Sequence, residues 1–275
     1  MADEIVLFKY EILNDVTHCF TARTGGVSSG GQKSLNLSFS REKSEENVRE
    51  NYRRVAKTLG TEFQNLTRVS QKHTKNVLKI TKDLVGIGIS KELPDYVKNT
   101  GFDAMITDVP EAVLCTSHAD CVPVMLYDSE NNAVAAIHSG WRGTVQKISA
   151  ETVALMSSEY STDPEFLKAV IGPSIGIDRF ETDSDVFEAL KNAFTEKFDE
   201  YSTKYIYQKN NEEGKLKYYI SVSGFVYETL LEAGLKPENI YYDNRCTFEN
   251  EDLFFSHRRD KGDTGIMAAM ISPRR

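Results

Sequence analysis

The stretch Ala119 to Thr144, ADCVPVMLYDSENNAVAAIHSGWRGT, decides the fold. Its two runs Val122 to Tyr127 and Ala133 to His138 are apolar almost throughout, which predicts two strands buried on both faces. The segment DSENN between the runs is typical of a turn. We therefore expect antiparallel neighbours, with the start of the first strand beside the end of the second.

Helices and strands interleave around this stretch without strict alternation, so we expect a mixed α+β fold. The chain shows no repeat, low-complexity tract or long linker, which predicts a single domain over residues 1–275. Hydrophobic spacing predicts helices at 44–60, 145–158, 186–198 and 222–233, strands at 17–22, 112–115, 167–171 and 240–242, and a hairpin around 210–214.

Composition excludes several classes of protein. The 275 residues include 33 Lys and Arg against 41 Asp and Glu, a net charge of −8, which argues against nucleic-acid and anionic-membrane partners. The apolar runs are too short to span a bilayer. Four cysteines without a CxxC pair or a signal stretch favour a reduced, cytoplasmic protein. The sequence leaves the oligomeric state open.

A candidate metal site follows from the predicted pairing of the two strands. Cys121 precedes the first strand and His138 ends the second, so the thiol and the imidazole should lie together; His73, in Ser70-Gln71-Lys72-His73, is the third candidate. One thiolate and two imidazoles with an open fourth position are typical of a catalytic zinc site. The alternative is structural, namely a buried cysteine and a histidine bonded to a carbonyl.

A basic pocket for a small anion is a second hypothesis. Arg142 follows the second strand at a predicted helix start, where backbone amides and the helix dipole favour an anion. Arg23 and the run His257-Arg258-Arg259 are further candidates for this pocket. The alternative is that these side chains are solvated at the surface.

The string Gly172-x-Ser174-x-Gly176 matches a nucleophile elbow, with His257 downstream. An elbow needs a helix that begins at the serine, whereas helical periodicity here resumes only near Asp183. We therefore favour a tight turn over a serine nucleophile.

The motifs together resemble the multicopper polyphenol oxidoreductase or laccase-domain family, which has been associated with purine nucleoside phosphorylase activity. The resemblance covers nearly the whole chain, and ADC followed by HSGWRGT is its most specific part. Its segments include 18–28, 34–37, 71–73, 102–104, 119–124, 137–144, 171–176, 246–247 and 256–260. It implies one domain with mixed sheets layered between helices, and Zn²⁺ held by His73, Cys121 and His138.

The resemblance also implies the chemistry. We expect a zinc-dependent phosphorylase that acts on adenosine, inosine or methylthioadenosine, with a secondary adenosine deaminase activity. The partners are then a small nucleoside and phosphate, the latter held by Arg142, and Arg23 is a candidate substrate-binding residue. Asn36, Gln71 and Asp120 are candidate hydrogen-bonding groups for the substrate.

Three other functions remain as alternatives. Related proteins are associated with peptidoglycan editing, the removal of a misincorporated L-Ser from a UDP-muramate precursor by amide hydrolysis. The laccase label suggests polyphenol oxidation with Cu²⁺ at the same three residues. Five histidines cannot supply a blue-copper centre plus a separate copper cluster, so the label fits at most one copper. A noncatalytic binding module would leave the metal-like triad unexplained.

The chain departs from the family pattern at two arginines. Tyr52 and Ile266 stand where the family commonly has arginine. If those arginines contact phosphate in relatives, Arg53 or Arg54 should replace the first of them, or phosphate use should be weaker.

Overall fold

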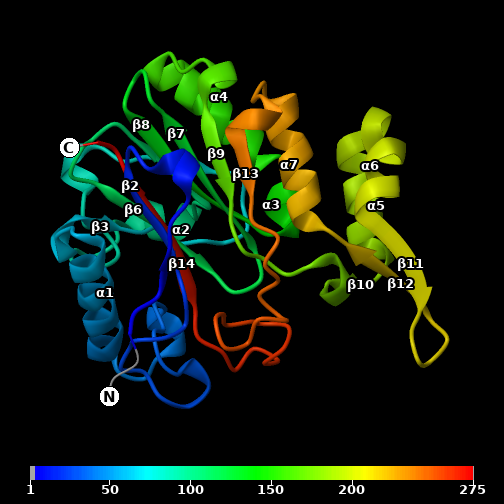
Figure 1. Ribbon diagram of the computed structural model, residues 1–275, viewed down its shortest axis with the longest axis horizontal. Coiled ribbons are helices and arrows are strands. Elements are labelled where there is room, and N and C mark those ends of the chain that lie inside the picture. The colour runs from blue at the N-terminus through cyan, green and yellow to red at the C-terminus, as the bar shows by residue number, and fades with distance from the viewer. Residues whose placement is uncertain (1–3, 275) are drawn as a thin grey trace.

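Two mixed sheets form the centre of the molecule, and helices cover their outer faces (Figure 1). The computed structural model describes residues 4–274. The six-stranded sheet has the order β13-β9-β7-β8-β5-β4, with bounds Ile240–Tyr242, Lys168–Ile171, Val122–Asp128, Ala133–Ser139, Ala104–Thr107 and Val77–Lys79. The five-stranded sheet has the order β1-β2-β14-β6-β3, with bounds Leu7–Phe8, Thr17–Thr21, Met267–Ser272, Val113–His118 and Leu66–Thr67.

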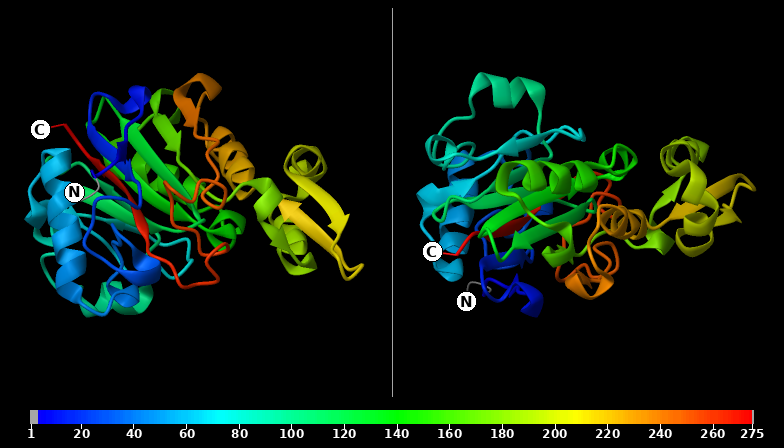
Figure 2. Two further views of the ribbon diagram at one scale, coloured as in Figure 1. Left: turned by 60° about the horizontal axis from the view of Figure 1, so that its bottom comes forward. Right: turned by 90° about the horizontal axis from the view of Figure 1, so that it is seen from above.

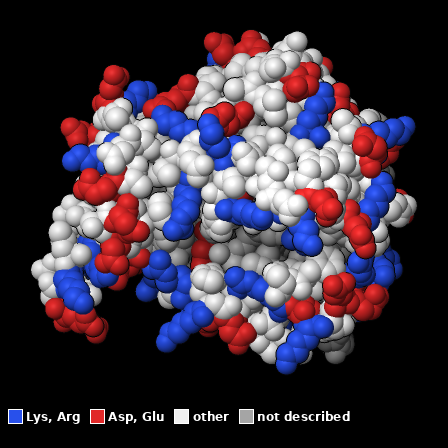
Figure 3. All heavy atoms as spheres, turned by 180° about the vertical axis from the view of Figure 1, so that it is seen from behind, with Lys and Arg blue, Asp and Glu red and all other residues white. Residues whose placement is uncertain are grey.

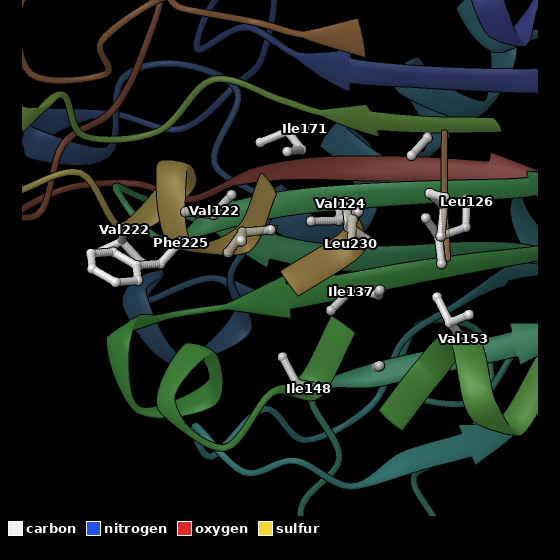
Figure 4. Packing of buried hydrophobic residues seen from close by; sticks show 14 of the residues in the cluster. Val122, Val124, Leu126, Ile137, Ile148, Val153, Ile171, Val222, Phe225 and Leu230 are labelled. Atoms are coloured by element: carbon white, nitrogen blue, oxygen red, sulfur yellow. The ribbon is translucent and has the colours of Figure 1, made fainter. Parts of the chain in front are cut away.

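The central strands β7 and β8 are antiparallel and buried along their whole length, as expected. Val124 and Leu126 of β7 face the core that α4 (Ile148–Tyr160) and α7 (Val222–Glu232) cover (Figure 4). Met125 and Tyr127 point to the opposite core, which lies between the two sheets. Both faces of these strands therefore lie against apolar layers.

The helix predicted over 44–60 is α1 (Glu45–Leu59), and it packs against the five-stranded sheet. Val48, Tyr52, Val55 and Leu59 form its buried stripe. Gly60 ends the helix with φ 75°, a left-handed conformation that glycine adopts without steric cost. The order of layers is thus helix, sheet, sheet, helices, which confirms the predicted single α+β domain.

Two predicted helices are interrupted. The helical stripe after residue 145 is α4, and a separate short helix α3 (Trp141–Val145) precedes it. Lys147, whose φ is 57°, interrupts the helical backbone between them. The helix predicted over 186–198 is α5 (Ser184–Phe194), which a 3-10 turn over Thr195–Lys197 separates from α6 (Phe198–Tyr205). Hydrophobic spacing continues across both breaks because the flanking helices pack on the same core.

The predicted hairpin is β11 (Ile206–Asn210) with β12 (Leu216–Ile220), joined by β10 (Glu181–Thr182) in a three-stranded sheet. With α5 and α6 it projects to one side of the molecule (Figure 2). The remaining helix, α2 (Asp95–Thr100), precedes β5. Within residues 4–274, none of the helices has the length and apolar character needed to cross a membrane. Acidic and basic side chains alternate over the face in Figure 3.

Candidate metal centre

The pairing of β7 with β8 brings Cys121 and His138 together. Val122 lies opposite Ser139 and Pro123 lies opposite His138 in the antiparallel register. Cys121, one residue before β7, therefore lies at the end of β8, as the sequence predicts. The ends of the two strands supply two of the three expected ligands.

His73 joins them from the segment between β3 and β4. Its Nε2 lies 3.9 Å from the Cys121 Sγ, and its ring centroid lies 5.0 Å from that of His138. The candidate ligand atoms of the three residues all lie within 4.8 Å of one another, the one such group of three in residues 4–274. His73 has φ 60° and Asp120, next to Cys121, has φ 86°. Strained backbone of this kind is concentrated at functional sites.

Asp103, at the start of β5, orients the site from behind. Its Oδ1 accepts the His138 Nδ1–H at 2.8 Å, which leaves Nε2 of that ring free to bind a metal. Its Oδ2 accepts the backbone N–H groups of Lys72 at 3.1 Å and Thr74 at 2.6 Å, on either side of His73. One buried carboxylate thus fixes the position of two ligands. No role for Asp103 was expected from the sequence, although an acid beside a buried strand was a usable signal.

Charged neighbours set the ionisation of these groups. Burial opposes the charged form of Cys121, but the nearby His138 and His73 lower the pKa of its thiol to about 6. Burial likewise disfavours a charged His138, yet Cys121 and Asp103 raise its pKa to about 9. Burial raises and the contact with His138 lowers the pKa of Asp103, with a net result of about 2. A thiolate is therefore available at neutral pH.

The immediate surroundings leave room for an ion. A Cβ on Gly140 would lie 2.8 Å from the His73 Cδ2 and 3.0 Å from the Cys121 Sγ, so only glycine lets the backbone pass this closely. His₂Cys ligation with one open position is the donor set of a catalytic zinc site, and copper also binds such a set. The residues present therefore fit a single metal ion.

The three ligands lie on the wall of a cavity of about 520 Å³, within the usual range for small-molecule sites. Arg41, Arg68 and Arg258 also line it. Arg258 belongs to the basic run that was proposed as part of an anion pocket. Arg41 and Arg68 were missed: nothing in the local sequence of Arg41 indicates that it would meet the ligands, whereas Arg68 lies five residues before His73, which was a usable signal.

Gln71 and Asp120 line this cavity, but their polar atoms already have partners. Gln71 accepts the Ser117 N–H and donates to the Ser117 carbonyl, at 2.7 and 2.9 Å. Asp120 accepts the Thr247 hydroxyl at 2.6 Å and the Arg258 backbone N–H at 2.7 Å. Both side chains therefore hold the walls of the cavity together.

Asn36 and Arg23 are not among the residues that line the cavity; Asn36 lies behind its wall, bonded to the lining residues Ser38 and Ile266. Asn36 is fully buried, and its amide accepts the Ile266 N–H at 3.0 Å and donates to the Ser38 carbonyl at 3.3 Å. Arg23 lines a different pocket that also contains acidic side chains, and it donates to the Glu251 carbonyl at 2.9 Å. The structure therefore does not bring either residue to the metal centre as expected.

Arg142 is exposed and is not among the residues that line the cavity. Its guanidinium stacks over the Trp141 ring, 4.1 Å from the centroid. The long helix whose N-terminus was expected to strengthen an anion site is only the five-residue α3. The geometry thus gives no support to a phosphate clamp at Arg142.

The two positions at which this chain departs from the family pattern have different surroundings in the structure. Tyr52 is fully buried and donates to the Leu37 carbonyl at 2.9 Å, whereas Ile266 lines the cavity. Arg53 and Arg54, the expected substitutes, pair with Glu46 and Glu50 at 2.6 and 2.8 Å and do not line the cavity. Neither is placed to hold a ligand there.

Ser174 does not form a nucleophile elbow. It bridges in parallel to Cys246, and the chain then enters a 3-10 turn over Ile177–Arg179 rather than an α-helix. This outcome agrees with the tight turn that we favoured.

Comparison with known proteins gives a consistent result. The family model described as multi-copper polyphenol oxidoreductase laccase matches residues 17–274. Purine nucleoside phosphorylase YlmD of Bacillus subtilis is 31% identical over 92% of this chain and 86% of its own length. A purine nucleoside phosphorylase of Bacteroides thetaiotaomicron is 34% identical over 91% of this chain and 90% of its own length.

Solved structures agree with the fold. The hypothetical protein YfiH of Bacillus licheniformis superposes with a TM-score of 0.87 at 30% identity, over 98% of this chain and 96% of that chain. YlmD of Geobacillus stearothermophilus gives a TM-score of 0.82 at 27% identity, over 97% and 94%. With its layered sheets and its His-Cys-His centre, this chain belongs to the multi-copper polyphenol oxidoreductase laccase family.

Proposed function

We propose that this chain is a zinc-dependent purine nucleoside phosphorylase that acts on inosine and adenosine, with methylthioadenosine as a further substrate. The observation that carries the proposal is the single cavity in which a His-Cys-His set and arginine side chains occur together. The names of the relatives support the same activity.

The reaction breaks the bond between the ribose C1′ and the purine nitrogen and forms a bond from C1′ to a phosphate oxygen. The electron pair of the broken bond goes to the base, and the proton of hydrogen phosphate ends on that base. The products are the free purine and ribose 1-phosphate. Positive charge develops on the ribose, so a phosphate held beside it stabilises the transition state as well as attacking.

The protein's own groups have separate tasks in this scheme. His73, Cys121 and His138 would hold zinc, and Asp103 keeps the His138 ring in the tautomer that leaves Nε2 free. Zinc would supply Lewis-acid chemistry at the site. The arginines of the cavity wall bind the anion.

The test is an assay of purified protein with inosine or adenosine, with and without phosphate, followed by chromatography of the bases and measurement of bound metal. We expect phosphate-dependent release of hypoxanthine or adenine, with ribose 1-phosphate. Ammonia from adenosine would establish the secondary deaminase activity. A Cys121→Ser variant should lose zinc, with activity reduced by about 100-fold or more. Failure of the wild-type protein to release base would refute the proposal.

The state of the cysteines bears on the cellular location. The described cysteines are all free thiols, which supports the cytoplasmic location that we propose. The partners in this proposal are a nucleoside and phosphate, without nucleic acid or membrane.

A second candidate is amide hydrolysis, as in peptidoglycan editing. Cys121, His138 and Asp103 form a thiolate, imidazolium and carboxylate series, which suits covalent catalysis. The Cys121 sulfur would attack the amide carbonyl, and the amine of L-Ser would leave with the His138 proton; water would then cleave the thioester. Release of serine from a serine-bearing muramate precursor by metal-stripped protein would favour this candidate over phosphorolysis.

A further inference from the structure

The geometry points to Arg41 and Arg68 as a subsite for a phosphate group beside the metal centre, with Arg258 at its rim. This inference rests on the proposed function, because inorganic phosphate is the co-substrate there. The two arginines are half-buried and line the same cavity as His73, Cys121 and His138.

The cavity wall is positive within an acidic protein. Three arginines line it, and Asp120 is the one acidic residue among the lining residues. Both carboxylate oxygens of Asp120 already accept hydrogen bonds, from the Thr247 hydroxyl and the Arg258 backbone N–H. Among residues 4–274, no carboxylate lies within ion-pair distance of Arg41, Arg68 or Arg258. The positive charges of these three arginines are therefore available to a bound anion.

Five arginines elsewhere in the described chain show the contrast, whereas Arg23, Arg49, Arg142 and Arg274 also lie without a carboxylate within ion-pair distance. Carboxylates of nearby Glu or Asp residues neutralise arginines on the surface of α1, in the 3-10 turn Ile177–Arg179 and in the loops near the carboxyl end. These paired arginines are Arg53, Arg54, Arg179, Arg245 and Arg259. The protein has acids available for pairing, yet none is placed against the cavity arginines.

Arg68 carries an unused donor. Its Nε is buried and has no hydrogen-bond partner in the described structure, and the guanidinium lies 5.5 Å from the Phe39 centroid. A buried N–H without a partner is costly, and a phosphate oxygen would satisfy it. Phe39 in turn stacks on Tyr52, at 6.0 Å. Arg68 thus lies beside the position at which the family pattern has arginine and this chain has tyrosine.

Arg41 is held in place by two backbone carbonyls and a histidine ring. Its Nη1 donates to the Gly262 and Thr264 carbonyls at 2.9 and 3.4 Å, and its Nη2 lies 3.2 Å from the His257 Nδ1. These contacts orient the guanidinium without neutralising it. They also tie it to the loop that leads to Ile266, the second position at which the family pattern has arginine. Two arginines from other parts of the sequence therefore lie near the two missing ones.

The chemistry of the subsite favours a phosphate group over a carboxylate. Two guanidinium groups present planar forks of N–H donors, and such forks match the oxygens of a phosphate dianion. The group has two sources, inorganic phosphate or the 5′-phosphate of a nucleotide. The experiment below separates them.

The first measurement is calorimetric titration of zinc-loaded protein with inorganic phosphate. We expect Arg68→Gln and Arg41→Gln to raise the phosphate Kd by about 10- to 100-fold each, with Arg41→Lys in between because it keeps the charge and loses the fork. Arg49→Gln is the matched control, since Arg49 also lies 5.5 Å from the Phe39 centroid but does not line the cavity. It should leave the Kd unchanged. Zinc content and Tm of every variant are measured alongside.

The second measurement is steady-state phosphorolysis. The same variants should raise KM for phosphate and leave KM for the nucleoside within about twofold of wild type. Unchanged phosphate Kd and KM in folded, zinc-loaded Arg68→Gln and Arg41→Gln proteins would overturn the subsite, whatever the activity of the wild type. If Arg41→Gln fails to fold, Arg68→Gln decides alone, because within residues 4–274 the Arg68 guanidinium has no hydrogen bond that the substitution would remove.

A third arm compares a nucleoside with its 5′-monophosphate. Tighter binding of the nucleotide that disappears in Arg68→Gln supports the subsite and assigns it to a nucleotide phosphate. Arginine-dependent phosphate binding without any phosphorolysis by the wild type supports the subsite while refuting the proposed function. The two hypotheses can therefore fail separately.

Discussion

Cysteine and histidine occur close together in two parts of this molecule, once at the ends of β7 and β8 and once within the five-stranded sheet. In the sheet, Cys19 and Cys115 both lie opposite Met270 of β14, and His18 adjoins Cys19 in β2. Burial raises the pKa of the Cys19 thiol to about 12 and raises that of Cys115 as well, whereas the pKa of Cys121 falls to about 6.

The histidines differ in the same way. Burial lowers the pKa of His18, which accepts the Tyr10 N–H at 2.8 Å and donates to the Val16 carbonyl. At the metal centre burial acts in the same direction, but Cys121 and Asp103 raise the pKa of His138 to about 9. The comparison shows that burial alone gives inert, neutral groups. Charged partners placed around a buried group turn the same residue types into a reactive centre.

The sharpest test of this contrast is alkylation of metal-free protein with iodoacetamide, with each modified cysteine identified by mass spectrometry. The thiolate fraction of Cys121 rises with pH through about 6, so its alkylation rate should level off near pH 7. Cys19 and Cys115 remain neutral and buried, so their rates should be lower by about 1000-fold or more at pH 7. Equal rates for the three thiols would abolish the distinction.

Removal of the negative charge of Asp103, which bonds His138, should have the next largest effect, a loss of zinc affinity. In Asp103→Asn the side chain loses its negative charge, and it cannot accept from His138, Lys72 and Thr74 together. We expect zinc affinity to fall by about 10- to 100-fold, as measured by competition with a chelator. The exposed Asp108→Asn variant is the control. Unchanged affinity in Asp103→Asn would show that the strand geometry alone sets the centre.

A single added methyl group should have the smallest effect. Gly140→Ala would place a Cβ 2.8 Å from the His73 Cδ2, so the ring must move, whereas Gly143→Ala meets Ile148 at 3.4 Å and can be accommodated. We expect Gly140→Ala to weaken zinc binding by about 5- to 10-fold and Gly143→Ala to leave it unchanged. Zinc titration of the two proteins measures the difference. Equal affinities would show that the centre is less tightly packed than its contacts indicate.

Much of this arrangement could be predicted from local patterns. The continuous apolar runs that became β7 and β8 define their own pairing, because a five-residue turn leaves little choice, and the position of Cys121 beside His138 follows. The α1 stripe and its terminal Gly60 are similarly local. The breaks at Lys147 and Thr195 were missed because hydrophobic spacing records the face that is buried and not the continuity of the backbone.

The remaining parts of the site depend on long-range packing. Asp103 reaches His138 only because β5 pairs with β8, and Arg41 reaches the cavity from a 3-10 turn that is more than 30 residues from His73 in sequence. The arginine of the HSGWRGT motif was the more attractive candidate by sequence, yet Arg142 turns onto Trp141. A motif indicates which residue types are present and leaves the direction of each side chain to the tertiary structure.

Asp120 has a consequence for the thermodynamics of ligand binding. It directly precedes the candidate ligand Cys121, and its carboxylate accepts the backbone N–H of Arg258, so Asp120 connects the candidate metal centre with the rim of the proposed anion subsite. A shift of either is transmitted to the other through this carboxylate. Binding at the two places is then reciprocal: the factor by which zinc changes the affinity for phosphate equals the factor by which phosphate changes the affinity for zinc.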